Sequence, residues 1–372
     1  MKKNYFLIGS LFISSYFFPF YKLISIADLL KDQKVTYQKV EEQKSFEFER
    51  PFLSLGDLIQ PYRGAWQETF VLIIPHGRVH STNGWVTIDN CCIKELFWCG
   101  VIGHIKHIPQ ASEEKLQKIS GRVVVLAQPA SGNYYHYMYE ILGRLLLIEQ
   151  QGIEYDWLYV PFHKPFMKEL LQLWGVDMTK VIQPSGIGYY IQADELIVPS
   201  MIINTCFERE PDFGGYLRPD VVEKIKDRLI KAADHYDTVQ NYAKKIFISR
   251  KDGKRNVPNE DEVFELFKEK GFVRYELGKM PVVEQIKLFQ NAEVVVAIHG
   301  AGCFNMIFCK SGTKFIELFQ ALRDATFSFL APSIGIDYSV VQTVDFITKP
   351  GLDAHLSTPM PLFIIKEVVK NL

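Results

Sequence analysis

Short apolar runs alternate with amphipathic segments through the middle of the chain. The runs RVVVLA (122–127), DWLYVP (156–161) and ADELIVPS (193–200) have the length of buried strands. The intervening segments, NYYHYMYEILGRLLLIEQQG (133–152) and PFMKELLQLWG (165–175), have the apolar spacing of helices. This alternation indicates an α/β domain with a mainly parallel sheet.

The same alternation restarts at Lys245, after a helical segment at 218–236. Strand-like runs occupy 245–250, 272–277, 294–298 and 314–318, and helices are expected at 259–271 and 281–292. In the first of these helices, Asn259 is the expected N-cap, Glu262 completes a capping box, and Gly271 ends the helix. The pattern predicts two Rossmann-like halves facing a cleft, with ligands outside the carboxyl ends of the strands.

The N-terminal residues have a different character and suggest a domain plan. Residues 1–25 read as a hydrophobic anchor, 26–48 as a charged linker, 49–235 as one α/β domain, and 236–372 as a second with a C-terminal helix. Lys2 and Lys3 precede eighteen uncharged residues, just long enough to span a bilayer, and would stay in the cytoplasm. A cleaved signal peptide and a monotopic anchor are the alternatives. Because no N-x-S/T sequon occurs, a bacterial-type or cytoplasm-facing protein is favoured over a lumenal one.

Composition narrows the function classes. The net charge is −1, so the chain lacks the basic surplus expected of a nucleic-acid-binding protein. Six cysteines in 372 residues form no disulfide framework. Cys91, Cys92, Cys99, His104 and His107 could form a zinc site, but no C-x-x-C pair exists and the segment is otherwise apolar. Buried small hydrophobes are the favoured interpretation, and no metal site is predicted.

A glycine turn follows the strand-like run VVVAI. His299, Gly300, Ala301 and Gly302 open a helical segment that includes Asn305. A helix N-terminus offers N–H groups to an anion, and glycine lets the backbone approach it closely, so a diphosphate fits. A tight turn with a helix cap is the alternative. The turn matches neither a Walker loop nor a dinucleotide fingerprint, and the absence of G-x-S-x-G argues against a hydrolase.

Two further strand ends carry polar groups in the same half. Ser249 and Arg250 end one strand, and Arg255 follows across a short loop. Arginines there suit bidentate phosphate contacts, and a solvated basic loop is the alternative. Glu317 ends the strand after the glycine turn, where a carboxylate could accept from ribose hydroxyls or cap a helix.

The first half contributes a polar stripe on a helix. If Asn133 caps this helix, His136 and Glu140 share one face, and Arg144 extends it by one turn. Histidine is the usual general base, and a neighbouring carboxylate orients it. A surface salt-bridge stripe is the alternative.

Together and in this order, these stretches resemble glycosyltransferase family 61. The resemblance covers about Pro129 to Phe319 and rests on five matched patterns. These are N-x-x-H-x-x-x-E at Asn133, His136 and Glu140; S-R-x(4)-R-x(3)-N-E at Ser249, Arg250, Arg255, Asn259 and Glu260; E-Q at Glu284 and Gln285; H-G-A-G-x-x-N at His299, Gly300, Ala301, Gly302 and Asn305; and E-L at Glu317 and Leu318.

The resemblance implies a GT-B-like fold and an inverting, metal-independent enzyme without a cofactor. The expected donor is a nucleotide sugar, a UDP-sugar first, and the acceptor is a hydroxyl of a glycan or protein. The absence of any D-x-D motif agrees with metal independence. His136 or Glu140 would act as base, and donor contacts would come from the second half. Asn133, Arg144, Asn259 and Gln285 would support the site. A non-catalytic nucleotide- or glycan-binding protein and another phosphate-handling transferase are the alternatives.

Overall fold

The computed structural model shows a mixed α/β protein. It describes residues 21–48, 62–97, 108, 115–186, 188–203, 205–207, 217–237, 241–251, 253, 256–320, 326–343 and 357–372. Most of the predicted anchor, residues 1–20, lies outside this range. Within the range, no helix has the length and apolar character needed to cross a membrane.

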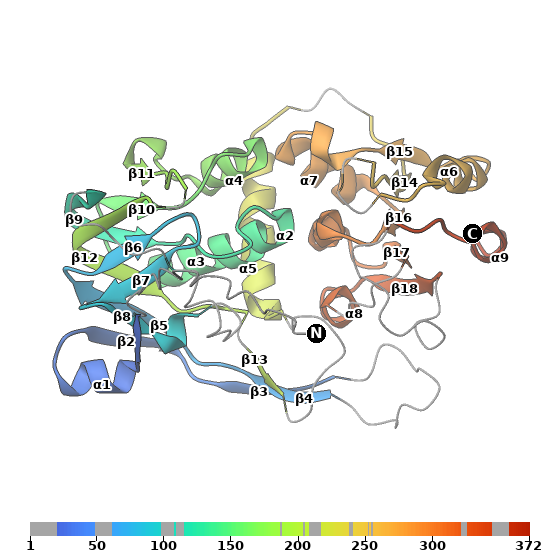
Figure 1. Cartoon of the computed structure of the whole chain (residues 1–372). Coiled ribbons are helices and arrows are strands. Elements are labelled where there is room, and N and C mark those ends of the chain that lie inside the picture. Colours follow the sequence, from blue (N-terminus) through green and yellow to red (C-terminus); the bar gives the residue numbers. More distant parts are fainter. Residues whose placement is uncertain are drawn as a thin grey trace, which may run out of the picture.

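A ten-stranded sheet organises the N-terminal half (Figure 1). Its strands are β1 (Lys22–Ile24), β2 (Thr36–Glu41), β5 (Thr69–Pro75), β6 (Arg78–His80), β7 (Trp85–Ile88), β8 (Cys91–Ile93), β9 (Gln117–Val125), β10 (Trp157–Tyr159), β11 (Val181–Ile182) and β12 (Tyr190–Pro199). Its helices are α1 (Ile26–Lys31), η1 (Lys94–Leu96), α2 (Tyr134–His136), η5 (Tyr137–Ile141), α3 (Leu142–Gln150), α4 (Pro165–Trp174) and η6 (Met178–Lys180).

The expectation of a mainly parallel sheet was wrong for this half. Strands β9, β10, β11 and β12 are parallel, as the alternation predicted, but β5 and β6 pair with β12 in the antiparallel sense. Hairpin strands from residues 69–93 therefore extend the parallel part, which makes the sheet mixed.

The linker expected at residues 26–48 is also corrected. These residues form α1 and β2, and β2 pairs with β5 at an edge of the large sheet. They also form β3 (Lys44–Phe48), which joins β4 (Tyr62–Trp66) and β13 (Thr205–Phe207) in a three-stranded sheet. The segment is polar because β2 is an edge strand with partly exposed side chains.

A five-stranded parallel sheet organises the C-terminal half. Its strands are β14 (Lys245–Ile248), β15 (Val273–Tyr275), β16 (Val294–Ile298), β17 (Lys314–Phe319) and β18 (Asp337–Gln342), in the order β15-β14-β16-β17-β18. The helices are α5 (Pro219–Ala233), α6 (Glu260–Lys268), η7 (Leu277–Lys279), α7 (Val282–Asn291), η8 (Ala301–Phe308), α8 (Thr326–Ser333) and α9 (Leu362–Lys370). The expected parallel sheet and C-terminal helix are confirmed here.

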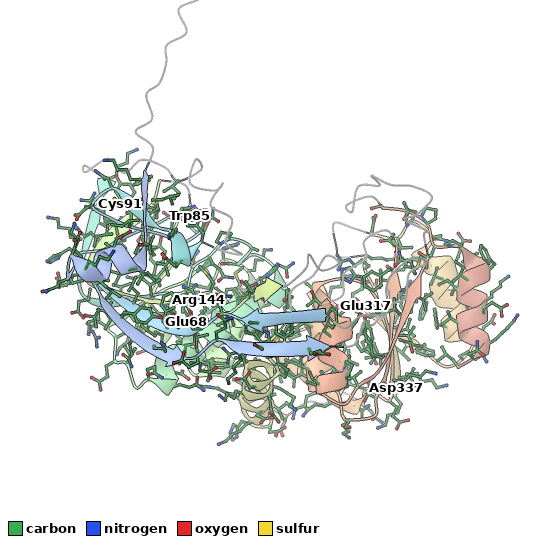
Figure 2. All side chains as sticks on the ribbon, turned by 90° about the horizontal axis from the view of Figure 1, so that it is seen from below. Glu68, Trp85, Cys91, Arg144, Glu317 and Asp337 are labelled. Carbon is green, nitrogen blue, oxygen red and sulfur yellow. The ribbon has the colours of Figure 1, made fainter. Side chains whose placement is uncertain are left out.

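Both faces of this sheet are covered. Phe247, Val296 and Ile316 pack with residues of α6 and α9, whereas Val295 and Phe315 belong to the largest core cluster. That cluster also contains residues of α3, α5, α7 and η8, so it joins the two halves. Helix α5 stands between the two main sheets in Figure 1, and Figure 2 places Arg144 in one half and Glu317 in the other.

Candidate active site

The strand order of the C-terminal sheet defines where a ligand is expected. If the five strands are numbered 1 to 5 in chain order, from β14 to β18, their order across the sheet is 2-1-3-4-5, and β14 and β16 lie side by side. In doubly wound sheets of this order, the chain reverses direction between the first and third strands, and ligands bind beyond their carboxyl ends. Ser249 and Arg250 follow β14, and His299 and Gly300 follow β16. The structure therefore brings two of the predicted stretches to one point.

Gly300 allows Arg250 to lie directly on the turn. A Cβ atom built on Gly300 would stand 1.4 Å from Nη1 and 2.3 Å from Cζ of Arg250. The backbone of Gly300 is extended, with φ 165°, so close approach rather than backbone conformation requires glycine here. The segment that follows is the 3-10 helix η8, whose first residue is Ala301. Its first N–H groups have no acceptor within the helix, and its N-cap residue Gly300 lies against the guanidinium of Arg250.

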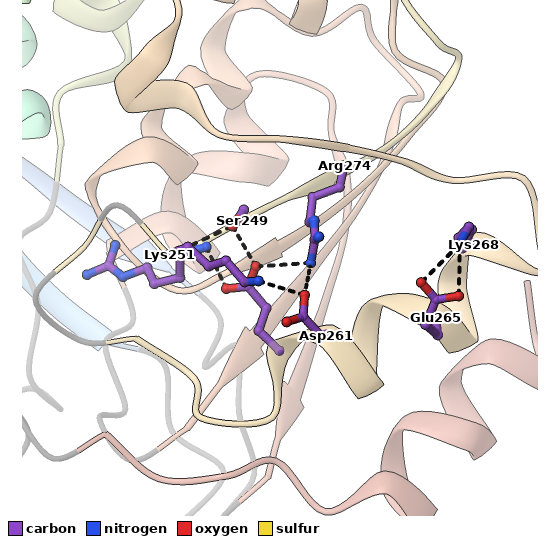
Figure 3. Close-up of polar contacts among 8 residues, drawn as sticks. Ser249, Lys251, Asp261, Glu265, Lys268 and Arg274 are labelled. Atoms are coloured by element: carbon purple, nitrogen blue, oxygen red, sulfur yellow. Dashed lines mark hydrogen bonds and ion pairs between the residues drawn. The ribbon is translucent and has the colours of Figure 1, made fainter.

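Ser249 holds the loop in place rather than facing a ligand. Its buried hydroxyl donates to Oε1 of Glu260 at 2.5 Å, and Oε2 of Glu260 accepts from the backbone N–H of Arg250 at 2.9 Å. Figure 3 shows Ser249 beside a cluster in which Lys251 and Arg274 both bind Asp261, at 2.6 Å each. The start of α6 thus anchors the residues before and after Arg250. Arg255 lies outside the described residues.

The predicted capping box of α6 is wrong. Asn259 occupies the N-cap position, but its side chain makes no capping hydrogen bond. Instead it donates to the carbonyl of Met360 at 2.9 Å and accepts from the Met360 N–H at 2.8 Å. Asn259 therefore ties the segment before α9 to the loop that carries Arg250.

Glu317 is fully buried, with an exposed fraction of 0%. Its Oε1 lies 2.7 Å from Nδ1 of His299, and its Oε2 accepts a hydrogen bond from the hydroxyl of Tyr338. The His299 ring stacks on Phe319, with centroids 4.5 Å apart. Both oxygens of Glu317 thus have partners inside the protein, and His299 is the member of this group next to the glycine turn.

Asn305 and Gln285 form a buried scaffold beneath the turn. Asn305 Nδ2 donates to the carbonyl of Gly302 and to Oε1 of Gln285, at 3.1 Å each. Gln285 in turn donates to the carbonyls of Leu277 and Met280. Asn305 was predicted to bind the donor, but its side chain has no exposed surface and all of these partners belong to the protein.

In the N-terminal half, His136 and Glu140 form a hydrogen-bonded pair. Asn133 caps α2 by accepting from the N–H groups of Tyr135 and His136, as expected. A π-helical turn, η5, follows, and such turns are frequent at functional sites. Nδ1 of His136 lies 2.5 Å from Oε1 of Glu140. The side chain of His136 is 19% exposed and that of Glu140 only 1%, so the histidine is the outer member.

Arg144 lies beneath this pair and not on a surface stripe. Its guanidinium donates to the carbonyl groups of Val125, Leu126 and Pro199, at 2.9 to 3.2 Å. Its side chain is 1% exposed, and burial lowers the pKa of Arg144 to about 10. Arg144 therefore ties the ends of β9 and β12 together, and the surface salt-bridge alternative is excluded.

Gln128 connects Arg144 to the His136–Glu140 pair. Its amide nitrogen donates to Oε2 of Glu140, and its amide oxygen accepts from Arg144 at 3.4 Å. Both oxygens of Glu140 therefore have partners within the protein. The row Arg144–Gln128–Glu140–His136 leads from the core of the sheet to a partly exposed imidazole.

Aromatic contacts bring this helix against the glycine turn. The Tyr134 hydroxyl donates to Oδ1 of Asn305 at 2.9 Å. The Tyr135 ring packs edge-on against Phe304 and Phe327, at 5.2 and 5.8 Å between centroids, and against the ring of His136 at 4.7 Å. The ring of Phe327 also lies 6.3 Å from the ring of His299. The His136–Glu140 pair and the His299–Glu317 pair therefore border one region.

Four residues at the site were not singled out from the sequence as site residues. Gln128 and Tyr134 lie next to the matched N-x-x-H pattern, and Glu260 is the last letter of the S-R pattern, so proximity to these motifs was a usable signal. Tyr338 lies twenty-one residues beyond Glu317 and carries no local signal, because only the pairing of β17 with β18 brings it close.

The zinc alternative finds no support among the described residues. Cys91 and Cys92 lie on β8 as free thiols, partly buried and buried. Cys99, His104 and His107 lie outside the described residues. Within the described part of the chain, no group of three metal-ligating side chains occurs.

The C-terminal parallel sheet has an arginine and a glycine turn at its switch point, beside the partly exposed His136 and the buried Glu140. Residues 134–316 match the family model Glycosyltransferase 61. The chain therefore carries a glycosyltransferase family 61 domain and is a glycosyltransferase. The matched segment contains the His–Glu pair, the Arg250 loop and the glycine turn. No curated protein matches the chain by sequence.

Proposed function

We propose that the chain is an inverting, metal-independent glycosyltransferase. It transfers a sugar from a nucleotide sugar, with a UDP-sugar as the expected donor, to a hydroxyl group of a glycan or protein. The observation that carries this proposal is the guanidinium of Arg250 lying against Gly300, between the ends of β14 and β16.

The leaving diphosphate would be stabilised by the protein itself. Its negative charge develops as the bond to the anomeric carbon breaks, and preorganised donors aimed at that charge lower the barrier. Arg250 offers a charged fork of N–H donors, and the residue it lies against, Gly300, is the N-cap of η8. The sequence has no D-x-D motif to hold a metal on the diphosphate. These groups support a metal-independent reaction.

The acceptor would be activated by His136. With Nδ1 donating to Glu140, Nε2 is the nitrogen that takes the proton from the acceptor hydroxyl. The acceptor oxygen forms a bond to the anomeric carbon, the bond to the diphosphate oxygen breaks, and the configuration inverts in this single displacement. Glu140 orients the ring, since it is buried and both of its oxygens have partners.

The proposed enzyme has a GT-B-like layout. The donor would bind to residues 236–372 and the acceptor to residues 49–235, with the site where α2 meets η8. We also propose attachment to the membrane through residues 1–25, on the basis of their sequence.

A donor panel tests the substrate class. Thermal shifts and donor hydrolysis are measured with UDP-, GDP- and CMP-sugars, with and without a chelator. One nucleotide class should stabilise the protein, and hydrolysis should continue in the chelator. Loss of binding or hydrolysis on chelation would contradict metal independence, and no binding by any class would contradict the nucleotide-sugar donor.

The base is tested by variants at the His–Glu pair. His136→Ala should lower kcat by about 100- to 10,000-fold, and Glu140→Gln should lower it less, while donor binding stays near the wild-type value. His235→Ala, at an exposed histidine beyond α5, is the matched control and should keep full activity. Normal turnover in both pair variants would remove His136 from the mechanism.

A further inference from the structure

A carboxylate buried within a parallel sheet needs a physical reason. Glu317 sits on β17, between Phe315 and Phe319 on the face that packs against the largest core cluster. An ionised carboxylate without partners is very costly in such surroundings. Glu317 accepts hydrogen bonds from the Nδ1 atom of His299 at 2.7 Å and from the hydroxyl of Tyr338, and the thiol of Cys303 also lies against it.

The three residues come from successive strands. His299 follows β16, and its backbone N–H donates to the carbonyl of Leu318 at 2.9 Å. Tyr338 lies on β18 opposite Phe315, so its ring points along the sheet face toward Glu317, two residues further on. The order Tyr338–Glu317–His299 therefore runs across the sheet toward the glycine turn.

The remaining neighbours leave His299 little freedom. Its ring is stacked on Phe319 at an interplanar angle of 18° and approaches Phe327 at 6.3 Å. Among the described residues, the thiol of Cys303 lies near Glu317 and Arg250, Ser328 lies beside the hydroxyl of Tyr338, and Arg250 lies against Gly300. Burial, and then Glu317, raise the pKa of Cys303, which keeps this thiol neutral.

This geometry assigns each ring nitrogen of His299 a role. Because Glu317 accepts hydrogen bonds when ionised, Nδ1 carries a proton and donates to it. Nε2 is then the nitrogen available to a ligand. His299 immediately precedes Gly300, against which Arg250 lies, so the same turn carries the imidazole and borders the guanidinium.

We propose that Tyr338 is a positioning residue that acts through Glu317 to hold His299 against the donor diphosphate. In this proposal Glu317 acts through His299 and is not a ribose ligand, because its side chain is fully buried and both of its oxygens already accept hydrogen bonds within the protein. Since phosphate oxygens only accept hydrogen bonds, the bound imidazole carries protons on both nitrogens, and the charge of Glu317 balances it. This inference rests on the proposed nucleotide-sugar donor site.

A measurement without ligand tests the relay itself. NMR spectra are recorded on protein labelled with ¹⁵N at histidine, and the His299 signals are assigned by their loss in His299→Gln. The buffer is alkaline, so that the imidazole is neutral and its two nitrogen signals show which nitrogen carries the proton. Wild type should show His299 protonated at Nδ1 alone. Tyr338→Phe should show a mixture of the two tautomers, because Glu317 loses one of the donors that fix it. A wild-type ring protonated at Nε2, or an unchanged spectrum in Tyr338→Phe, would overturn the relay.

A double-mutant cycle tests its role in binding. The dissociation constant of UDP is measured by calorimetry for wild type, Tyr338→Phe, His299→Gln and the double variant. Tyr338→Phe should weaken binding by about 3- to 10-fold, the loss of one hydrogen bond in a network. The double variant should bind no more weakly than His299→Gln alone, whereas a merely structural role gives additive losses.

Tyr275→Phe is the matched control for Tyr338→Phe, and the outcomes below distinguish failure of the relay from failure of the proposed function. Tyr275→Phe removes a hydroxyl that accepts from the Ala243 N–H on the same sheet, and should leave UDP binding unchanged. Additive losses in the cycle, or an equal loss in Tyr275→Phe, would refute the positioning role while leaving the proposed function intact. Failure of wild type to bind UDP would count against the expected donor, and the labelled-histidine spectra would still decide the relay.

Discussion

The contact between Gly300 and Arg250 gives a sharp prediction. In Gly300→Ala, the new methyl group would stand 1.4 Å from Nη1 and 2.3 Å from Cζ of Arg250, whereas ordinary contacts start near 3.4 Å. The guanidinium therefore has to move by about 2 Å, which exceeds the tolerance of a hydrogen bond. The backbone at this position is extended and accepts alanine without strain, so the substitution acts through the arginine.

The expected magnitude follows from the lost phosphate contacts. Hydrogen bonds to charged groups contribute about 1.5–3 kcal/mol each. Losing one of them raises the dissociation constant of UDP by about 10- to 150-fold. In contrast, Gly302→Ala meets only the end of the Leu277 side chain, at 2.9 Å, and should cost much less.

Calorimetry of UDP binding to Gly300→Ala, Arg250→Ala and the double variant tests this reasoning. Because both substitutions remove the same interaction, the double variant should bind no more weakly than Arg250→Ala alone. Urea denaturation of Gly300→Ala should show near-wild-type stability, since the displaced guanidinium is partly exposed. Wild-type affinity in Gly300→Ala, or losses that add in the double variant, would refute the role of the contact.

Two further predictions concern stability. Arg144→Met leaves buried carbonyl groups without their donor and should lower the free energy of unfolding by about 3–5 kcal/mol in urea denaturation. Arg144→Lys should lower it less. A loss under about 1 kcal/mol in Arg144→Met would contradict the role of Arg144 in tying β9 to β12. Burial, and then Arg78, lower the pKa of His80 to about 4, so the unfolded chain takes up a proton before the folded protein does. The stability from neutral His80 should therefore be present above pH 6.5 and fall by up to about 3 kcal/mol as the pH drops toward 4. The free energy of unfolding should fall less over this pH range in His80→Gln than in wild type. An equal fall in the two proteins would contradict the role of His80.

The sequence allowed most of the C-terminal half to be predicted. Buried parallel strands read as continuous apolar runs, and the helices between them keep a clear spacing, so β14, β15, β16 and β17 fall close to the expected runs. The edge strand β2 was taken for a linker because all six of its residues are exposed or partly exposed and most of them are polar.

The candidate site was predicted in kind but not in the role of each residue. Sequence spacing placed His136 and Glu140 on one helical face, and their hydrogen bond agrees with it. It could not show that Arg144 points into the sheet, because the carbonyl groups that bind it come from strands β9 and β12. It also could not pair Tyr338 with Glu317, since that contact depends on strand register.

The burial of Arg144 has a consequence for the order of folding. Its guanidinium loses water only when α3 docks, and its partners include Val125 at the end of β9 and Pro199 at the end of β12. Those two strand ends are far apart in sequence, so closing that loop is slow compared with forming the helix. A docked α3 with only one strand in place would hold a poorly compensated buried cation. We therefore expect β9 to pair with β12 before α3 docks, and the turns α2 and η5, which carry His136 and Glu140 and run directly into α3, to reach their final position late.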